Sequence, residues 1–132
     1  YHKVGEKIML DKTLNITINK VQRNWVPSKE MYAPALAGKE YIVMSITMIN
    51  DGKYPASINA GDFYLMDSGK KKYPEGGAPM RHNRFLHQLI TSHDKILKNL
   101  AFVVPAGKTN LKLVYKRDNA KNKTIKVYIV DL

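Results

Sequence analysis

Two short polar segments hold the residue types that calcium, phosphate and acid–base sites use. Asn50-Asp51-Gly52-Lys53 and Asp67-Ser68-Gly69-Lys70 flank the apolar run Phe63-Tyr64-Leu65-Met66. A calcium loop needs oxygen ligands at alternate positions and a bidentate glutamate at its twelfth position. The next alternate position holds a lysine in the first segment and a glycine in the second, so neither segment fits. We instead predict two turns, in which glycine supplies the positive φ that a tight turn demands.

Three other segments share residue types with phosphate-binding or catalytic motifs. Gly107-Lys108-Thr109 ends like a phosphate-binding loop, but Phe102 stands where that loop needs a glycine, and a strand follows instead of a helix. Ser92-His93-Asp94 holds the residue types of a catalytic triad, yet a triad is assembled from separate segments. Ser68 and Lys71 match a Ser-x-x-Lys pattern without the helix that it requires. We therefore predict no catalytic residues, and the chain is not expected to be an enzyme.

Three histidines in the second half of the chain are the candidates for a metal site. His82, His87 and His93 are separated by five and six residues. Ligands on one strand face recur every two residues, and those on one helix face every three or four, so this spacing fits neither. Without cysteine, a blue-copper site is excluded. We predict no metal site and no cofactor, and we leave open whether these histidines bind a metal ion together.

Positive charge is concentrated in the second half of the chain. The net charge is +11, and residues 67–132 hold 14 of the 22 basic residues against five acids. The densest part is Lys70-Lys71-Lys72, and Arg81 and Arg84 follow it in the sequence. Such a surface attracts polyanions, or it serves solubility and discourages aggregation at strand edges. Few of these basic residues lie beside an aromatic ring that we expect to be exposed, which disfavours nucleic acid as a partner.

Composition limits the class of protein. At 132 residues the chain fits a single domain, residues 1–132, that can fold without a disulfide or a metal. It has no cysteine, which excludes disulfides, thiolate zinc sites and cysteine nucleophiles. No run of 18 apolar residues is present, so we expect no membrane-spanning segment. The chain starts at Tyr1, and we expect that an N-terminal signal and linker have been removed.

Alternation of apolar and polar residues predicts the elements that must position these side chains. Period-two patterns occur around residues 13–19, 42–48, 100–104, 111–115 and 125–130, with shorter candidates at 6–10 and 63–67. About seven such strands are typical of an immunoglobulin-like sandwich. We therefore predict an all-β fold of about seven antiparallel strands in two sheets. Residues 74–79 are expected to form a flexible connection, and residues 80–94 either a short helix or an irregular strand.

A long stretch without clear periodicity, residues 24–39, interrupts this pattern. It contains Trp25 and Tyr32, and Ser28 could cap one helical turn there. An exposed aromatic loop on a β-scaffold is a plausible binding surface. The alternative is that Trp25 folds back and caps the sandwich.

A series of motifs runs from residue 38 to residue 73. It consists of a Gly-Lys-x-Tyr start, an alternating strand, an Asn-x-Gly turn, a serine, and then Asp-Phe-x-Leu-x-Asp-x-Gly-x-x-x-Tyr; the residues are Gly38, Lys39, Tyr41, Asn50, Gly52, Ser57, Asp62, Phe63, Leu65, Asp67, Gly69 and Tyr73. A later block, residues 97–115, has an apolar strand ending in Val-Pro and then Leu-x-Leu-x-Tyr. Their order resembles a bacterial domain family of unknown function, found mostly in surface lipoproteins and secreted proteins of Gram-positive bacteria. The likeness covers roughly residues 5–131, but the family's usual Pro-Gly-Glu turn is replaced here by Thr-Ser-His-Asp-Lys.

The resemblance implies an immunoglobulin-like sandwich similar to that of a mycobacterial immunoprotective secreted antigen. It also implies export, usually with a lipidated cysteine before the domain, and it offers no catalytic residues. We therefore expect a non-enzymatic extracellular binding module of a surface lipoprotein, attached to the outer face of the bacterial membrane, whose partner is a protein or an envelope polymer. The alternative is a polyanion-binding domain, for a cell-wall polymer or nucleic acid, that uses Lys70, Lys71, Lys72, Arg81 and Arg84.

Overall fold

The computed structural model describes residues 2–10, 12–26, 37–76, 84, 86–118 and 123–129. These ranges contain ten strands and one short 3-10 turn, η1 (Ala60–Asp62). The strands are β1 (Lys7–Met9), β2 (Leu14–Gln22), β3 (Lys39–Asn50), β4 (Ala56–Asn59), β5 (Phe63–Met66), β6 (Lys72–Pro74), β7 (His87–Ile90), β8 (Lys95–Pro105), β9 (Lys112–Asp118) and β10 (Lys123–Ile129). In the described part of the chain, no helix has the length and apolar character needed to cross a membrane.

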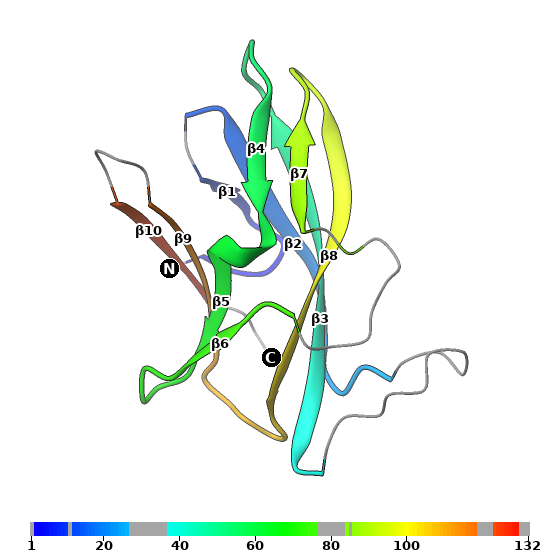
Figure 1. Ribbon diagram of the computed structural model, residues 1–132, viewed down its shortest axis with the longest axis vertical. Helices are drawn as coiled ribbons and strands as arrows, with labels where there is room; N and C mark the ends of the chain where they lie inside the picture. Colours follow the sequence, from blue (N-terminus) through cyan, green and yellow to red (C-terminus); the bar gives the residue numbers. More distant parts are fainter. Residues whose placement is uncertain are drawn as a thin grey trace.

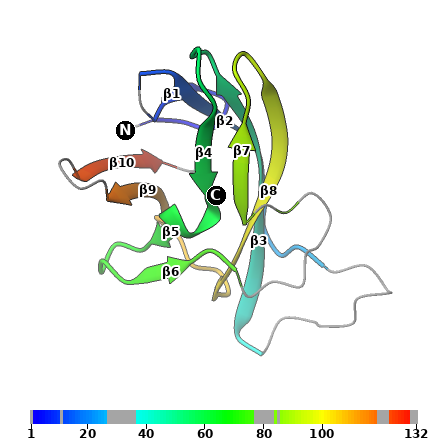
Figure 2. The ribbon, with the colours of Figure 1, turned by 45° about the horizontal axis from the view of Figure 1, so that its top comes forward.

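The strands form two four-stranded sheets and one two-stranded sheet. The first has the order β1-β2-β3-β8, the second β10-β9-β5-β6, and the third pairs β4 with β7. Every pairing between these strands is antiparallel. Figures 1 and 2 show β3 and β8 as the long strands of the molecule, with the β5–β6 and β9–β10 pairs packed beside them.

One large hydrophobic cluster joins all three sheets. Ile16 and Phe102 enter it from the first sheet, Leu65 and Tyr115 from the second, and Ile58 from the third, and each of them is almost completely buried. The alternation along β2 explains this arrangement, because Leu14, Ile16 and Ile18 face inward while the polar residues between them face the other side of the sheet. The register of β2 against β3 shifts between Ile18 and Lys20, which marks a β-bulge.

The predicted all-β sandwich of antiparallel strands is confirmed, but it has ten strands where about seven were expected. The additional strands are β4, β6 and β7, each only three or four residues long. Part of the segment for which a helix or an irregular strand was expected forms β7, and Arg84 makes an isolated bridge to Asn99. The expected helical turn from Ser28 to Tyr32 and residues 77–79 of the expected connection lie outside the described residues.

Candidate functional site

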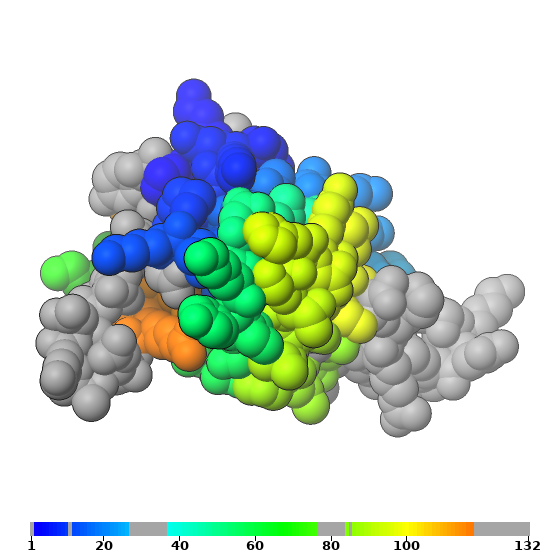
Figure 3. Space-filling model, turned by 90° about the horizontal axis from the view of Figure 1, so that it is seen from above, coloured from blue at the N-terminus to red at the C-terminus, as the bar shows by residue number. Residues whose placement is uncertain are grey.

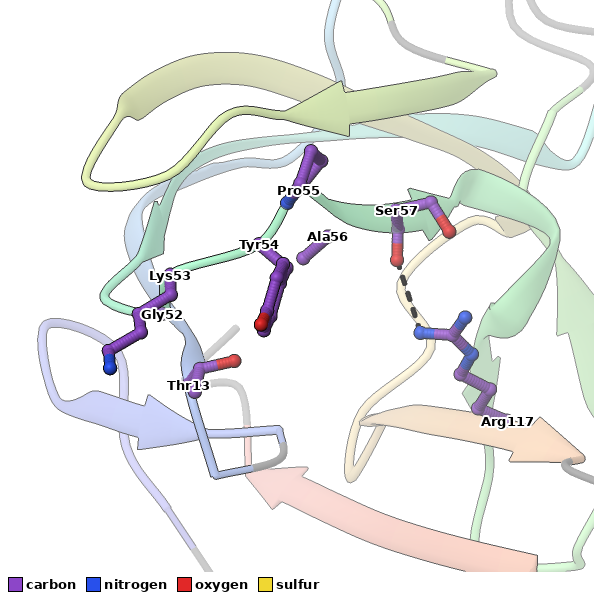
Figure 4. Close-up of a pocket in the computed structure, with 8 residues that line it drawn as sticks. All are labelled: Thr13, Gly52, Lys53, Tyr54, Pro55, Ala56, Ser57 and Arg117. Carbon is purple, nitrogen blue, oxygen red and sulfur yellow. Dashed lines mark hydrogen bonds between the residues drawn. The ribbon is translucent and has the colours of Figure 1, made fainter.

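The connection between β3 and β4 forms one wall of a surface pocket. Residues 52–57 line it together with Thr13 from the β1–β2 connection and Arg117 from β9, and its volume is about 320 Å³ (Figure 4). Figure 3, which looks down on this end of the molecule, shows this green segment beside the yellow-green segment of β7 and β8. The pocket is therefore assembled from segments that are distant in the sequence.

Asn50, at the end of β3, fixes the conformation of this loop from beneath. Its side chain is fully buried. The amide nitrogen donates to the carbonyl oxygens of Tyr54, at 2.8 Å, and Ile90, at 3.0 Å, while the amide oxygen accepts from the Gly52 N–H at 2.9 Å. One buried amide thus holds both ends of the loop and ties the loop to β7.

Two further contacts fasten the start of the loop. The Asp51 N–H donates to the Thr13 carbonyl oxygen at 2.8 Å, and the Ser92 hydroxyl donates to the Gly52 carbonyl oxygen. A Cβ atom placed on Gly52 would lie 2.9 Å from the Thr13 Cβ. The predicted turn is confirmed, but the reason given for its glycine was wrong: Gly52 is needed for close approach to Thr13 and does not have a positive φ.

The pocket combines an aromatic ring, two cations and hydroxyl groups. Tyr54 is 81% exposed although its backbone is held in place. Arg117 donates one N–H to the Ser57 carbonyl oxygen at 3.1 Å, and Figure 4 shows its guanidinium across the pocket from the Tyr54 ring. Lys53 is exposed on the same loop. This set can bind a polar ligand through ring contact and charged hydrogen bonds.

The second polar segment of the sequence is the turn of the β5–β6 hairpin. The Lys71 N–H and the Tyr73 hydroxyl donate to the Asp67 carboxylate at 2.9 and 3.0 Å, and the Lys108 ammonium lies 3.3 Å from it. This turn is also confirmed, but positive φ occurs at Lys70, at 65°, and not at Gly69, where it was expected. The Asp67 carboxylate therefore accepts hydrogen bonds from its own hairpin, and these contacts explain an acidic residue at this position.

The Asp67 carboxylate is stabilised in its charged form. The backbone hydrogen bond from Lys71 lowers its pKa most, and contacts with Tyr73 and Lys108 add to this effect against the opposing effect of burial. Burial, with the neighbouring carboxylate, raises the pKa of the Tyr73 hydroxyl. The contacts with Lys71 and Tyr73 lie within the β5–β6 hairpin, and the contact with Lys108 joins the hairpin to the β8–β9 connection, so these shifts report a role in the fold.

The three consecutive lysines remain at the surface of this hairpin. Lys70, Lys71 and Lys72 are exposed, and the ammonium groups of Lys71 and Lys72 lie 5.6 and 5.1 Å from the ring centroids of Tyr73 and Tyr64. The turn of this hairpin and the β3–β4 connection lie far apart in the molecule (Figure 1). The structure therefore separates the lysine cluster from the pocket.

Of the two arginines that were predicted to act with these lysines, the structure describes Arg84. Arg84 donates from Nη2 and Nε to the Glu75 carboxylate, at 2.9 and 3.3 Å. Glu75 is almost fully buried and also accepts from the Ala101 N–H at 3.0 Å, so Arg84 helps to fix this segment against β8. Arg81 lies outside the described residues.

Glu40 is a second buried carboxylate with several partners. It accepts hydrogen bonds from the Arg23 guanidinium and from the N–H groups of Asn24 and Gly107, at 3.1 and 3.0 Å. Burial alone would raise the pKa of Glu40, but these hydrogen bonds outweigh it and hold the pKa below its ordinary value of 4.5. The carboxylate joins the end of β2 to the β8–β9 turn.

Trp25 and Tyr32 were the aromatic candidates in the early loop. Trp25 is partly buried on the outer face of the first sheet, where it packs against Tyr41, Val43 and Ala101, with ring centroids 6.1 Å apart for Trp25 and Tyr41. Tyr32 lies outside the described residues.

The histidines and the triad residue types are dispersed. His87 contacts the Asn59 side chain, His93 lies in the β7–β8 turn, and His82 lies outside the described residues. Among the residues that the structure describes, no three His, Cys, Asp or Glu side chains form a group that could hold a metal ion. Asp94 accepts from the Thr91 hydroxyl at 3.3 Å, and Ser92 donates to Gly52, so neither engages His93 in these contacts.

Comparison with protein-family models matches residues 2–126 to a family described as a domain of unknown function, DUF4352. The chain belongs to this family. A search of curated proteins finds no match to this DUF4352 chain. The expected likeness to a β-sandwich family of unknown function is thus confirmed.

Solved structures share the fold of this DUF4352 chain. The yjhA protein from Bacillus subtilis has a TM-score of 0.74 and 22% identity, over 99% of this chain and 100% of that one. The ycdA protein of the same organism, a candidate lipoprotein, has a TM-score of 0.69 and 19% identity, over 98% of this chain and 39% of that one. MPT63, a secreted protein from Mycobacterium tuberculosis, has a TM-score of 0.61 and 11% identity, over 98% of each chain. At these identities the likeness shows the fold.

The site residues predicted from the sequence did not include Tyr54, Lys53 or Arg117. A usable signal was present, because Tyr54 stands between Lys53 and Pro55 in a turn, outside the alternation that buries aromatic residues. Arg117 carried no such signal, since only the folding of β9 near β4 brings it to the pocket of this chain.

Proposed function

We propose that this chain is a non-enzymatic binding module that works outside the bacterial cell, with the β3–β4 pocket as its contact site. One observation carries the proposal: the highly exposed ring of Tyr54 stands on a loop whose backbone is fixed by the fully buried Asn50. A rigidly presented tyrosine offers a large contact area at a low cost in conformational entropy.

The proposed location is the outer face of the bacterial membrane, with a lipid anchor upstream of the domain. A candidate lipoprotein and a secreted protein among the structures of similar fold support this location. The absence of cysteine from the chain is compatible with it, because the hydrophobic core needs no disulfide. The partner in this proposal is an envelope polymer or an envelope protein.

Binding of the labelled chain to a purified cell-envelope fraction tests the proposal. We expect saturable binding that Tyr54→Ala reduces by at least about tenfold, without a change in melting temperature, because the side chain is exposed. Leu97→Ala is the matched control, since it removes another exposed apolar side chain, on β8. Equal binding by Tyr54→Ala and the unmodified chain would reject the pocket as the contact site.

A second candidate function is polyanion binding by the lysines of the β5–β6 turn. The observation in its favour is that Lys70, Lys71 and Lys72 are all exposed, while the acidic group of the same turn, Asp67, is already engaged with Lys108. Retention on heparin at low salt that falls steeply as salt rises would support it, because neutralised anions release counterions. No retention at moderate salt, or equal retention by the triple Lys→Gln variant, would reject it.

A further inference from the structure

The geometry points to an anionic saccharide as the ligand of the β3–β4 pocket: a sugar or polyol that carries a phosphate or carboxylate group. This inference rests on the proposed function and specifies its ligand. In this arrangement the anionic group contacts the Arg117 guanidinium, and the carbon face of the sugar packs on the Tyr54 ring. The Lys53 ammonium points away from Arg117 and would act on the anion through its charge alone (Figure 4).

The charges around the pocket favour an anion. Its lining contains Lys53 and Arg117 but no acidic residue. Asp51, which precedes the lining segment, keeps its negative charge, but its carboxylate is directed to the Asn15 amide, 3.0 Å away, and does not line the pocket. The structure records no salt bridge between Arg117 and an acidic side chain within the described residues. A ligand that brings a negative charge would therefore supply a partner for Arg117.

The orientation of Arg117 is fixed before any ligand arrives. Its Nη1 group donates to the Ser57 carbonyl oxygen at 3.1 Å, which holds the guanidinium at the pocket edge and leaves its other donors for a ligand (Figure 4). A planar guanidinium matches the spacing of phosphate or carboxylate oxygens and can bind two of them at once. This pre-organisation lowers the entropy lost on binding.

The size and the lining of the pocket disfavour a small inorganic anion. A volume of about 320 Å³ lies at the lower end of the range for small-molecule sites. An inorganic anion would leave the Tyr54 ring without a contact, whereas a sugar ring presents C–H groups that pack on an aromatic face. The pocket therefore suits one or two units of a phosphorylated or uronic saccharide.

Affinity measurements with defined probes test this inference. The probes are D-glucose 6-phosphate, sn-glycerol 3-phosphate, D-glucuronate, neutral D-glucose and inorganic phosphate, each titrated into the full chain by calorimetry or NMR. We expect a phosphorylated or uronic sugar to bind at least about tenfold more tightly than both D-glucose and inorganic phosphate, and less tightly as salt rises. The phosphate and carboxylate probes distinguish the two sources of the anionic group.

Variants locate the binding. Arg117→Gln should weaken binding of the preferred probe by about tenfold or more, the loss expected for charge-assisted hydrogen bonds. Lys53→Gln, in the exposed loop, provides a second test in case Arg117→Gln disturbs the fold, and Lys70→Gln is the matched charge control. A larger loss for Lys70→Gln than for Arg117→Gln and Lys53→Gln would overturn the inference, as would equal binding of glucose and glucose 6-phosphate.

The outcomes separate this inference from the proposed function. If no anionic sugar binds at millimolar concentration but binding to the envelope fraction still depends on Tyr54, the ligand class is wrong and the binding site stands. If Tyr54→Ala leaves envelope binding intact, both are wrong.

Discussion

Lys70 occupies a backbone conformation that side-chain-bearing residues rarely adopt. Its φ of 65° lies in the left-handed region, whereas the adjacent Gly69 does not have a positive φ. Left-handed geometry costs an L-residue roughly 1–2 kcal/mol. The β5–β6 turn therefore retains a lysine at a position where glycine would fit better, which is consistent with the second candidate function of this turn.

This strain gives a prediction for stability. Lys70→Gly should raise the free energy of unfolding by up to about 1 kcal/mol, because glycine adopts positive φ without the steric cost but loses more entropy on folding. Urea denaturation of the two proteins measures the difference. Lys71→Gly is the control, since no positive φ is found at Lys71, and it should not stabilise the protein. A loss of stability in Lys70→Gly would contradict this explanation.

Buried acidic residues act here through their contacts within the fold. Glu40, Asp67 and Glu75 each accept a backbone N–H and each lie beside a basic side chain. The ion pairs of all three join segments that are separate in the sequence. An acidic residue near a turn, which the sequence presents as a possible ligand, is thus better explained by the backbone groups that it satisfies.

At the scale of elements, the β3–β4 loop depends on Asn50. Asn50→Ala would leave the Gly52 N–H and the carbonyl oxygens of Tyr54 and Ile90 without this partner. We expect the free energy of unfolding to fall by about 2–3 kcal/mol. Binding to the envelope fraction should also weaken, because Tyr54 would no longer be held in place.

The control for this prediction is another asparagine with fewer contacts. Asn19 donates a single side-chain hydrogen bond, to the Thr47 hydroxyl at 2.8 Å, from an exposed position on β2. Asn19→Ala should cost less than Asn50→Ala in the same denaturation series and leave binding unchanged. Equal losses for the two variants would show that Asn50 has no special role in the loop.

A strand could be predicted from the sequence only where its own residues carry a clear alternating pattern. Long strands such as β2 and β3 were predictable because alternation over many residues is visible in the sequence. The short strands β4 and β7 were missed because four residues carry too little pattern, and their pairing is decided by contacts across 30 residues or so of chain. The pocket was missed for the same reason, since Thr13, Tyr54 and Arg117 meet only in the folded chain.

At the scale of the whole molecule, the two buried acids with lowered pKa values make stability depend on pH. Glu40 and Asp67 have folded-state pKa values below their ordinary values of 4.5 and 3.8. As pH falls, these two carboxylates are protonated in the unfolded chain before they are protonated in the folded chain. The stability that their charges contribute is therefore fully present above the ordinary pKa values, and it is lost as pH falls through the lower pKa values of the folded state.

Denaturation midpoints between about pH 3 and pH 7 measure this dependence. We expect a nearly constant contribution from these groups near neutral pH and a loss of stability on the acid side. The double variant Glu40→Gln, Asp67→Asn should be less stable at pH 7 and should show a flatter acid limb. An unchanged acid limb in the double variant would assign the pH dependence to other groups.

The arrangement of charge also separates the two candidate functions in space. The β3–β4 connection, which carries Lys53 and Tyr54, and the β5–β6 turn, which carries Lys70 and Lys71, lie far apart in the molecule (Figure 1). A ligand that binds at one end therefore leaves the backbone of the other end unaffected, unless it is long enough to reach both. This separation makes the site of binding directly measurable.

The most direct test is NMR mapping of the ¹⁵N-labelled chain with soluble fragments of the bacterial envelope. We predict that the perturbed backbone amides cluster at Thr13, in residues 52–57 other than Pro55, which has no N–H, and at Arg117, and that the perturbation disappears in Tyr54→Ala. Perturbations centred on Lys70, Lys71 and Lys72, with the pocket amides unchanged, would contradict it.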